Sequence, residues 1–128
     1  MFSLVAEVEE KVVGHVISSQ VTLMPTIPGL KMLGLGPVAV LPEMQRQGIG
    51  SRLIQEALQK GRAEGWHAMV VVGQPEFYTR FGFLPANRFE LRCEFRVPND
   101  NFLVVELKAG TLPELSGMVR YQPEFSGF

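Results

Sequence analysis

With 128 residues, 46% of them hydrophobic and 20% charged, the chain has the size of one folded domain and too much apolar content for a disordered one. Its formal net charge of -1 excludes a general attraction to a nucleic-acid backbone or to an anionic membrane. No apolar run approaches the roughly 20 residues that span a bilayer, and the acidic start does not fit a secretory signal, so we expect a single cytoplasmic domain over residues 1–128. Cys93 is the only cysteine, which excludes an intrachain disulfide and a cysteine metal cluster, and we expect it in the core.

The first third of the chain is rich in β-branched residues. Between Leu4 and Leu23 two extended runs flank the polar break at Glu9-Glu10-Lys11, which predicts an antiparallel hairpin. The segment from Met24 to Gly29 contains two prolines and predicts an irregular loop. The apolar run from Leu33 to Leu41 then predicts one central strand, ended by Pro42.

The middle of the chain changes period. Ile49, Leu53 and Ala57 recur every four residues, which predicts an amphipathic helix from about Gly50 to Glu64. A buried strand over Ala68–Val72 follows, so strand, helix and strand form a crossover with a parallel or splayed strand pair. Beyond it the sequence predicts a short helix over Pro75–Arg80, a strand over Phe102–Lys108, and an irregular tail over residues 109–128 in which Leu115, Val119, Tyr121 and Phe125 can pack down.

The start of the predicted helix carries a glycine turn, Gln47-Gly48-Ile49-Gly50-Ser51. A helix start offers free amide protons and a positive dipole end, and glycines let an anion approach the backbone. The alternative is a tight helix entry with no ligand. A nucleoside-triphosphatase loop is excluded because Gly50, not lysine, precedes Ser51. The dinucleotide-binding pattern G-x-G-x-x-A also matches Gly34-Leu35-Gly36-Pro37-Val38-Ala39. A strand and Pro42 follow these residues where that fold needs a helix, so we treat the match as a coincidence.

The run Gln45-Arg46-Gln47-Gly48-Ile49-Gly50 resembles the Q/R-x-x-G-x-G/A signature of the GNAT superfamily of acetyl-CoA-dependent N-acetyltransferases. A second run, GQPEFYTRFGF from Gly73 to Phe83, resembles the family's later motif, in which a tyrosine precedes a Gly-Phe pair. The resemblance covers Leu4 to Lys108. It implies an α/β fold of the acyl-CoA N-acyltransferase type, with a central mixed sheet, splayed strands and flanking helices.

The resemblance also implies a site. Acetyl-CoA would be the cosubstrate, with no metal, and its pantetheine arm would lie between the splayed strands. The Val40 amide would polarise the thioester carbonyl, and Tyr78 would protonate the leaving thiolate. The alternative for Tyr78 is core packing beside Phe77 and Phe81. The residues implied to bind the cofactor are Val38, Ala39, Val40, Gln45, Arg46, Gln47, Gly48, Ile49, Gly50 and Ser51.

No general base stands out in the sequence. Glu43 precedes the glycine turn and would face phosphates in the family, while His15 in the hairpin and His67 beside Trp66 fit structural roles. In the family, water or a backbone carbonyl can serve as the proton route.

The chain begins at the hairpin, where the family usually has a strand and one or two helices first, so the implied fold is abbreviated at its N-terminus. Either the tail or a second subunit, as in a homodimer, completes the acceptor wall, or the start is truncated. Two hypotheses follow: an N-acetyltransferase acting on an amine of a small molecule or a protein, or a CoA-binding module with weak or lost catalysis.

Overall fold

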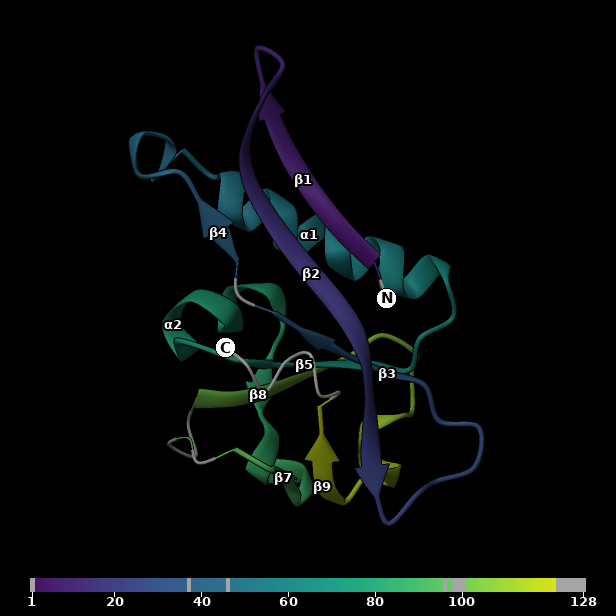
Figure 1. Cartoon of the computed structure of the whole chain (residues 1–128). Coiled ribbons are helices and arrows are strands. Elements are labelled where there is room, and N and C mark those ends of the chain that lie inside the picture. The colour runs from purple at the N-terminus through teal and green to yellow at the C-terminus, as the bar shows by residue number, and fades with distance from the viewer. Residues whose placement is uncertain (1, 37, 46, 96, 98–100, 122–128) are drawn as a thin grey trace.

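The computed structural model describes residues 2–36, 38–45, 47–95, 97 and 101–121. Strand β1 (Phe2–Val8) and strand β2 (Lys11–Met24) form the predicted antiparallel hairpin, which stands above the rest of the sheet in Figure 1. Glu9 and Glu10 form its two-residue turn with φ angles of 52° and 68°, the left-handed geometry that suits the twist of a tight hairpin. Helix α1 (Ile49–Ala63) lies behind the hairpin, within one residue of the predicted bounds.

Strand β2 is the longest strand and pairs with four others. Its start pairs with β1 and with β4 (Ala39–Val40), its middle with β3 (Met32–Leu35), and its end with β9 (Gly117–Arg120). The prediction of one continuous strand over Leu33–Leu41 was therefore wrong, because residues 36–38 separate β3 from β4. The residue at 37 is a proline, which has no N–H for a ladder, and its neighbour Gly36 favours a break.

Strand β5 (Ala68–Val72) lies parallel to β3, with α1 as the crossover between them. Its register runs from Met32 opposite Ala68 to Leu35 opposite Val71, which confirms the predicted strand–helix–strand unit. Strand β8 (Phe102–Glu106) pairs antiparallel with β5, and the short β6 (Leu84–Pro85) pairs with β8. Helix α2 (Pro75–Tyr78) continues into a 3-10 turn over Thr79–Phe81, and Gly82 ends it with φ 94°.

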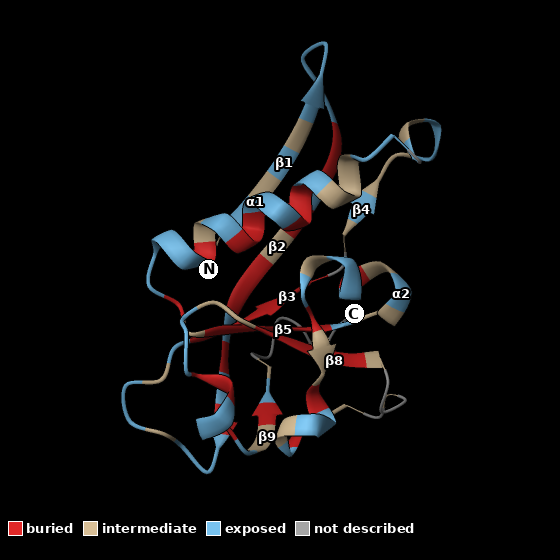
Figure 2. Ribbon diagram, turned by 180° about the vertical axis from the view of Figure 1, so that it is seen from behind, coloured by how far each residue is buried: buried red, intermediate tan, exposed pale blue. Residues whose placement is uncertain are grey.

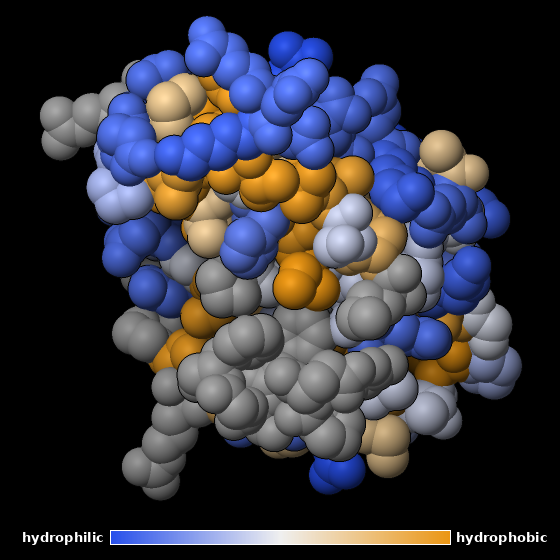
Figure 3. Space-filling view, turned by 45° about the horizontal axis from the view of Figure 1, so that its top comes forward, coloured by the Kyte–Doolittle hydropathy of each residue, from blue (hydrophilic) through white to orange (hydrophobic). Residues whose placement is uncertain are grey.

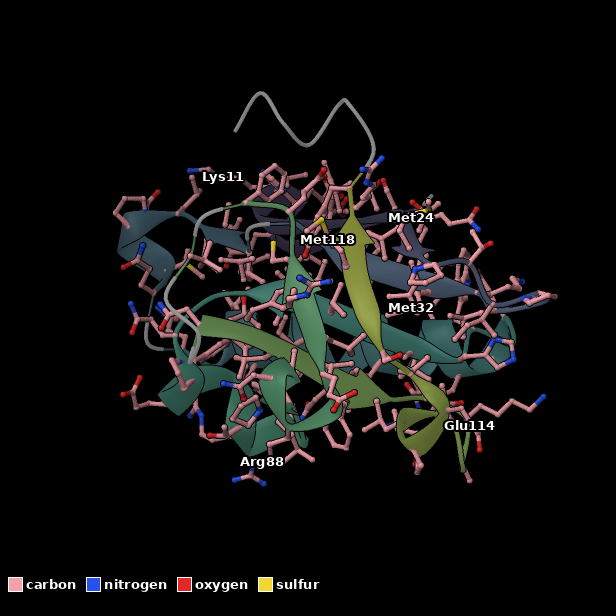
Figure 4. All side chains as sticks on the ribbon, turned by 90° about the horizontal axis from the view of Figure 1, so that it is seen from below. Lys11, Met24, Met32, Arg88, Glu114 and Met118 are labelled. Atoms are coloured by element: carbon pink, nitrogen blue, oxygen red, sulfur yellow. The ribbon has the colours of Figure 1, made fainter. Side chains whose placement is uncertain are left out.

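The chain after Gly110 is more ordered than the sequence indicated. Besides a 3-10 turn over Leu112–Glu114 it contains β9, which pairs with β2 on one side and with β7 (Leu91–Cys93) on the other. Figure 4 views this end from below, with Met118 of β9 beside its pairing partner Met24 of β2. The prediction of an irregular tail was wrong for residues 117–120; Phe125 lies outside the described residues.

Apolar side chains cover both faces of the central strands. In β5, Met69 and Val71 belong to the cluster under α1 and α2, and Ala68 and Val70 belong to the cluster on the other face. Figure 2 shows the central strands buried and the outer side of α1 exposed. Among the described residues, no helix combines the length and the apolar character needed to cross a membrane.

Candidate active site

The site begins where two neighbouring strands part. Strand β3 stays paired with β5 up to Leu35 opposite Val71, whereas β4 pairs with β2 alone. Val72, the last residue of β5, is 39% exposed, so nothing in the sheet covers it on the β4 side. The backbone of β4 therefore has one edge paired and the other edge facing the gap next to β5.

Hydrogen bonds fix which amides face that gap. The Leu41 N–H donates to the Val13 carbonyl at 2.8 Å, toward β2. Backbone groups alternate in direction along a strand, so Ala39 of β4 also faces β2, and the Val40 N–H faces the gap. The Gln45 side chain donates from Nε2 to the Val40 carbonyl at 3.2 Å, which leaves the Val40 N–H as the group of that residue still available to a ligand.

The glycine turn lies at the start of α1. Gly48 is the residue before the helix, has φ 79°, and makes no side-chain cap. The first bond into the helix runs from the Arg52 N–H to the Gly48 carbonyl at 3.0 Å, so the N–H groups of Ile49, Gly50 and Ser51 are free in the manner of any helix start. Together with the helix dipole they favour an anion at this point. Arg46, the cation implied beside this turn, lies outside the described residues.

Three segments that are distant in sequence meet at Gly50. A Cβ atom built on Gly50 would lie 3.7 Å from Phe77 Cζ, 3.8 Å from Val38 Cγ1 and 3.9 Å from Val40 Cγ2. The start of α1, the gap-facing strand and α2 are therefore in contact range of one another. Phe77 was not singled out from the sequence as a site residue, although its place next to Tyr78 in the aromatic motif is the signal that could have found it.

Tyr78 is buried on the same face of the sheet as α1. Its ring packs edge-on against Phe77 and Phe83, with centroids 4.9 Å and 5.5 Å away, and it touches Gly73 at the end of β5, where a Cβ atom would overlap the ring. Burial raises the pKa of the Tyr78 hydroxyl above the ordinary 10.0, so the phenol keeps its proton at neutral pH. The structure thus shows the core packing considered as an alternative for Tyr78 and also places the residue beside the end of β5.

Other charged or polar candidates take different positions. Glu43 pairs with Lys11 across 3.6 Å at the surface, and the Nδ1 atom of His67 accepts the Lys31 N–H at 3.0 Å, far along the fold from the glycine turn. His15 is exposed on β2, directly opposite Ala39 of β4. Cys93 is half-buried in β7, where burial raises the pKa of its thiol.

A groove of about 550 Å³ runs between β1 and the first turns of α1. It touches Gln47 and Gly48, and its walls carry the carboxylates of Glu7 and Glu56 together with the Arg52 guanidinium, which pairs with Glu56 at 3.9 Å, so the walls are net acidic. A diphosphate is therefore less favoured in this groove than on the side of the turn toward Val38 and Val40. Among the described residues, no group of three His, Cys, Asp or Glu side chains lies close enough together to hold a metal ion.

Comparison with known proteins gives a consistent result. The family described as "Acetyltransferase (GNAT) domain" matches residues 2–85. The N-acetyltransferase YhbS of Escherichia coli is 33% identical over 120 residues, which cover 94% of this chain and 71% of YhbS. The E. coli N-acetyltransferase YjhQ is 37% identical over 83 residues, which cover 65% of this chain and 46% of YjhQ.

Solved structures extend the likeness to the whole described fold. The crystal structure of E. coli YhbS in complex with CoA matches with a TM-score of 0.90 and 33% identity, over 97% of this chain and 68% of that chain. A GNAT family acetyltransferase from Brucella melitensis in complex with acetyl-CoA matches with a TM-score of 0.75 and 33% identity, over 96% and 67%.

Proposed function

Because this chain belongs to the GNAT acetyltransferase family, we propose that it moves the acetyl group of acetyl-CoA to an amine of a small molecule or a protein by direct attack. The relatives crystallised with CoA and with acetyl-CoA support the choice of cosubstrate. The observation that carries the proposal is the convergence at Gly50, where the first turn of α1, the gap-facing residues of β4 and the helix that bears Tyr78 meet.

The chain's own backbone suits the two ends of the cosubstrate. The diphosphate would lie on the free amides from Gln47 to Ser51, where glycines at 48 and 50 leave the backbone open. Arg46 would add positive charge there, on the strength of the motif alone. Gln45 would act through its side chain, which holds the Val40 carbonyl, since its own N–H already donates to Pro42.

The pantetheine arm would lie in the gap between β4 and β5. Val40 would bind it through its gap-facing N–H and Val38, by the family resemblance, through its backbone, while Ala39 would keep β4 attached to β2. The Val40 N–H would hold the thioester oxygen as negative charge develops on it, which is the role of an oxyanion donor. A fixed backbone donor needs no reorganisation at the moment of reaction.

The reaction then requires two proton transfers. The neutral amine attacks the carbonyl carbon, the C–N bond forms, and the electron pair moves to the oxygen held by Val40. When the tetrahedral intermediate collapses, the C–S bond breaks and the thiolate takes a proton from the Tyr78 hydroxyl. A phenol held protonated by burial is ready for this step across the neutral range.

Two measurements test the proposal. Calorimetric titration should detect acetyl-CoA binding, and thiol release should follow when phenethylamine, spermidine or a peptide with a free N-terminus is added. The Tyr78→Phe variant should bind acetyl-CoA as the unchanged protein does and release thiol far more slowly. Absence of binding heat would refute the proposal altogether, and binding without turnover for any amine would favour a CoA-binding module.

A further inference from the structure

His15 lies one strand away from the expected reaction centre. It pairs with Ala39 in the antiparallel ladder between β2 and β4 and with Val5 on the β1 side. The Leu41–Val13 hydrogen bond sets the phase of this ladder, so His15 and Ala39 form a hydrogen-bonded pair, with Cα atoms about 5.5 Å apart. Directly opposed side chains point to the same face of a sheet. The imidazole therefore extends beside the strand that carries Val38 and Val40.

The face on which His15 lies follows from its neighbour. A Cβ atom on Gly14 would meet Ile49 and Leu53 of α1, both at 3.2 Å, so position 14 points toward the helix. Successive residues of a strand point to opposite faces, and His15 therefore points away from α1. The side chain is exposed, and none of the hydrogen bonds or ion pairs found among the described residues uses its ring.

The two faces of the sheet differ in access at this point. On one face α1, α2 and Tyr78 pack over the central strands in a buried cluster, and a groove remains between β1 and the first turns of α1. On the other face the hairpin is open at Val5, which pairs with His15 and is 55% exposed. Figure 3 looks down on the molecule from that side and shows hydrophobic residues gathered below a band of hydrophilic ones. An amine acceptor would approach from the face that carries His15.

We propose that His15 is the general base of the transfer, which accepts the proton that the attacking amine must lose. This inference rests on the proposed function, because it needs acetyl-CoA in the gap beside β4. As the C–N bond forms, the nitrogen proton passes to the imidazole of His15 on the open face. The thiolate takes its proton from Tyr78 on the helix-covered face, and both groups recover their starting states by exchange with solvent.

Acid and base thus lie on opposite faces of the sheet, with Tyr78 beside the end of β5 and His15 beside β4. Histidine suits the task because an imidazole gains and loses protons near neutral pH. The groups directly opposite it, Val5 on β1 and Ala39 on β4, carry no charge. The charged residues nearest along these elements are Glu7 of β1, and Lys11 of β2 with its partner Glu43.

The chain contains two histidines, which gives a matched pair of variants. The experiment compares His15→Gln with His67→Gln, using the panel amine that the unchanged protein acetylates fastest. We expect kcat/KM of the unchanged protein to rise with pH on the acidic side of its pH profile (the acidic limb), and His67→Gln should show the same rise. His15→Gln should lose the acidic limb, and its kcat/KM at neutral pH should be about 10²-fold lower, the lower end of what a general base contributes. Imidazole added to His15→Ala should restore part of the rate.

A second measurement is independent of turnover. In a proton NMR titration with acetyl-CoA, the ring signals of His15 should shift while those of His67 stay in place. Acetyl-CoA should bind His15→Gln with unchanged affinity. If acetyl-CoA binds but the His15 signals do not move, or if His15→Gln keeps both the rate and the limb, the role of His15 is overturned while the proposed function stands. If acetyl-CoA does not bind at all, the proposed function itself fails.

Discussion

Replacing Gly48 with alanine tests the glycine turn through its backbone. Gly48 has φ 79°, and a Cβ atom there would meet nothing within 4 Å. The substitution therefore adds no clash, and its cost is the conformational one of placing an L-residue in the left-handed region, about 1–2 kcal/mol. Because the turn is exposed, we expect the alanine variant to relax toward negative φ when no ligand is bound. Relaxation would turn the following amides away from their common point.

Binding of acetyl-CoA would then have to restore the left-handed turn. The free energy of about 1–2 kcal/mol appears as lost affinity, which corresponds to a dissociation constant about 5- to 30-fold higher. The assay is calorimetric titration with acetyl-CoA. Unfolding in urea should show little change, because relaxation of an exposed turn avoids most of the strain.

Gly29 provides the matched control. It also has φ 79°, a Cβ atom there would also meet nothing within 4 Å, and it lies in the loop between β2 and β3. Gly29→Ala carries the same backbone cost with no ligand nearby, so its affinity for acetyl-CoA should be unchanged. Equal dissociation constants for the two variants would refute the placement of the diphosphate on the turn at Gly48.

Four further outcomes follow from the contacts around the site. Tyr78→Phe should lower kcat by at least about 10²-fold. In the unchanged protein the raised pKa keeps the Tyr78 phenol protonated, so loss of its proton should cause no decline of kcat below pH 10. The pH profiles of thiol release, measured for the unchanged protein and the variant, check these two outcomes. Gly73→Ala should lower kcat with a smaller effect on acetyl-CoA binding, since the added methyl group would displace the Tyr78 ring; kinetics and calorimetry on the same variant separate the two effects. Gly34→Ala should destabilise the fold by about 1–3 kcal/mol in urea, because its Cβ would lie 2.5 Å from Val21 Cγ1 and 2.8 Å from the Tyr121 ring, whereas Gly50→Ala meets only ordinary contacts and should keep or raise stability through helix propensity. Burial raises the pKa of Tyr121, so its contribution to the free energy of unfolding is complete below the ordinary tyrosine pKa of about 10 and is lost as the pH rises beyond that value. The urea midpoints at about pH 8 and pH 11 should therefore differ by less in Tyr121→Phe than in the unchanged protein.

Local patterns were sufficient for the elements that are defined by their own residues. Helix α1 follows from the four-residue spacing of Ile49, Leu53 and Ala57, and β5 from a continuous run of apolar residues. The turn at Gly48 was predicted because glycines at a helix start leave the backbone open to an anion, and its left-handed φ of 79° came from the structure. The mixed sheet and the family implied by these motifs are confirmed by the matches to GNAT proteins.

Features that depend on pairing between distant segments were not predictable in the same way. Strand β9 is four residues long and has no apolar alternation of its own, and it forms because the end of β2 and β7 offer it two edges. The break between β3 and β4 was missed because Leu33 to Leu41 is apolar throughout, and hydropathy does not show where a partner strand turns away. Phe77 likewise becomes a site residue only through its approach to Gly50.

The placement of His15 shows why the missing base could not be read from the sequence. In isolation, a histidine in a strand has no assigned face and no known neighbour. The dipeptide Gly14-His15 acquires a meaning once the ladder to β4 is fixed. The absent side chain at 14 lets Ile49 and Leu53 approach the sheet, which holds the start of α1 against β4. The same register turns the next side chain to the opposite face, beside Ala39. One strand thus sets both the distance between the glycine turn and β4 and the position of His15 on the face of the sheet away from α1.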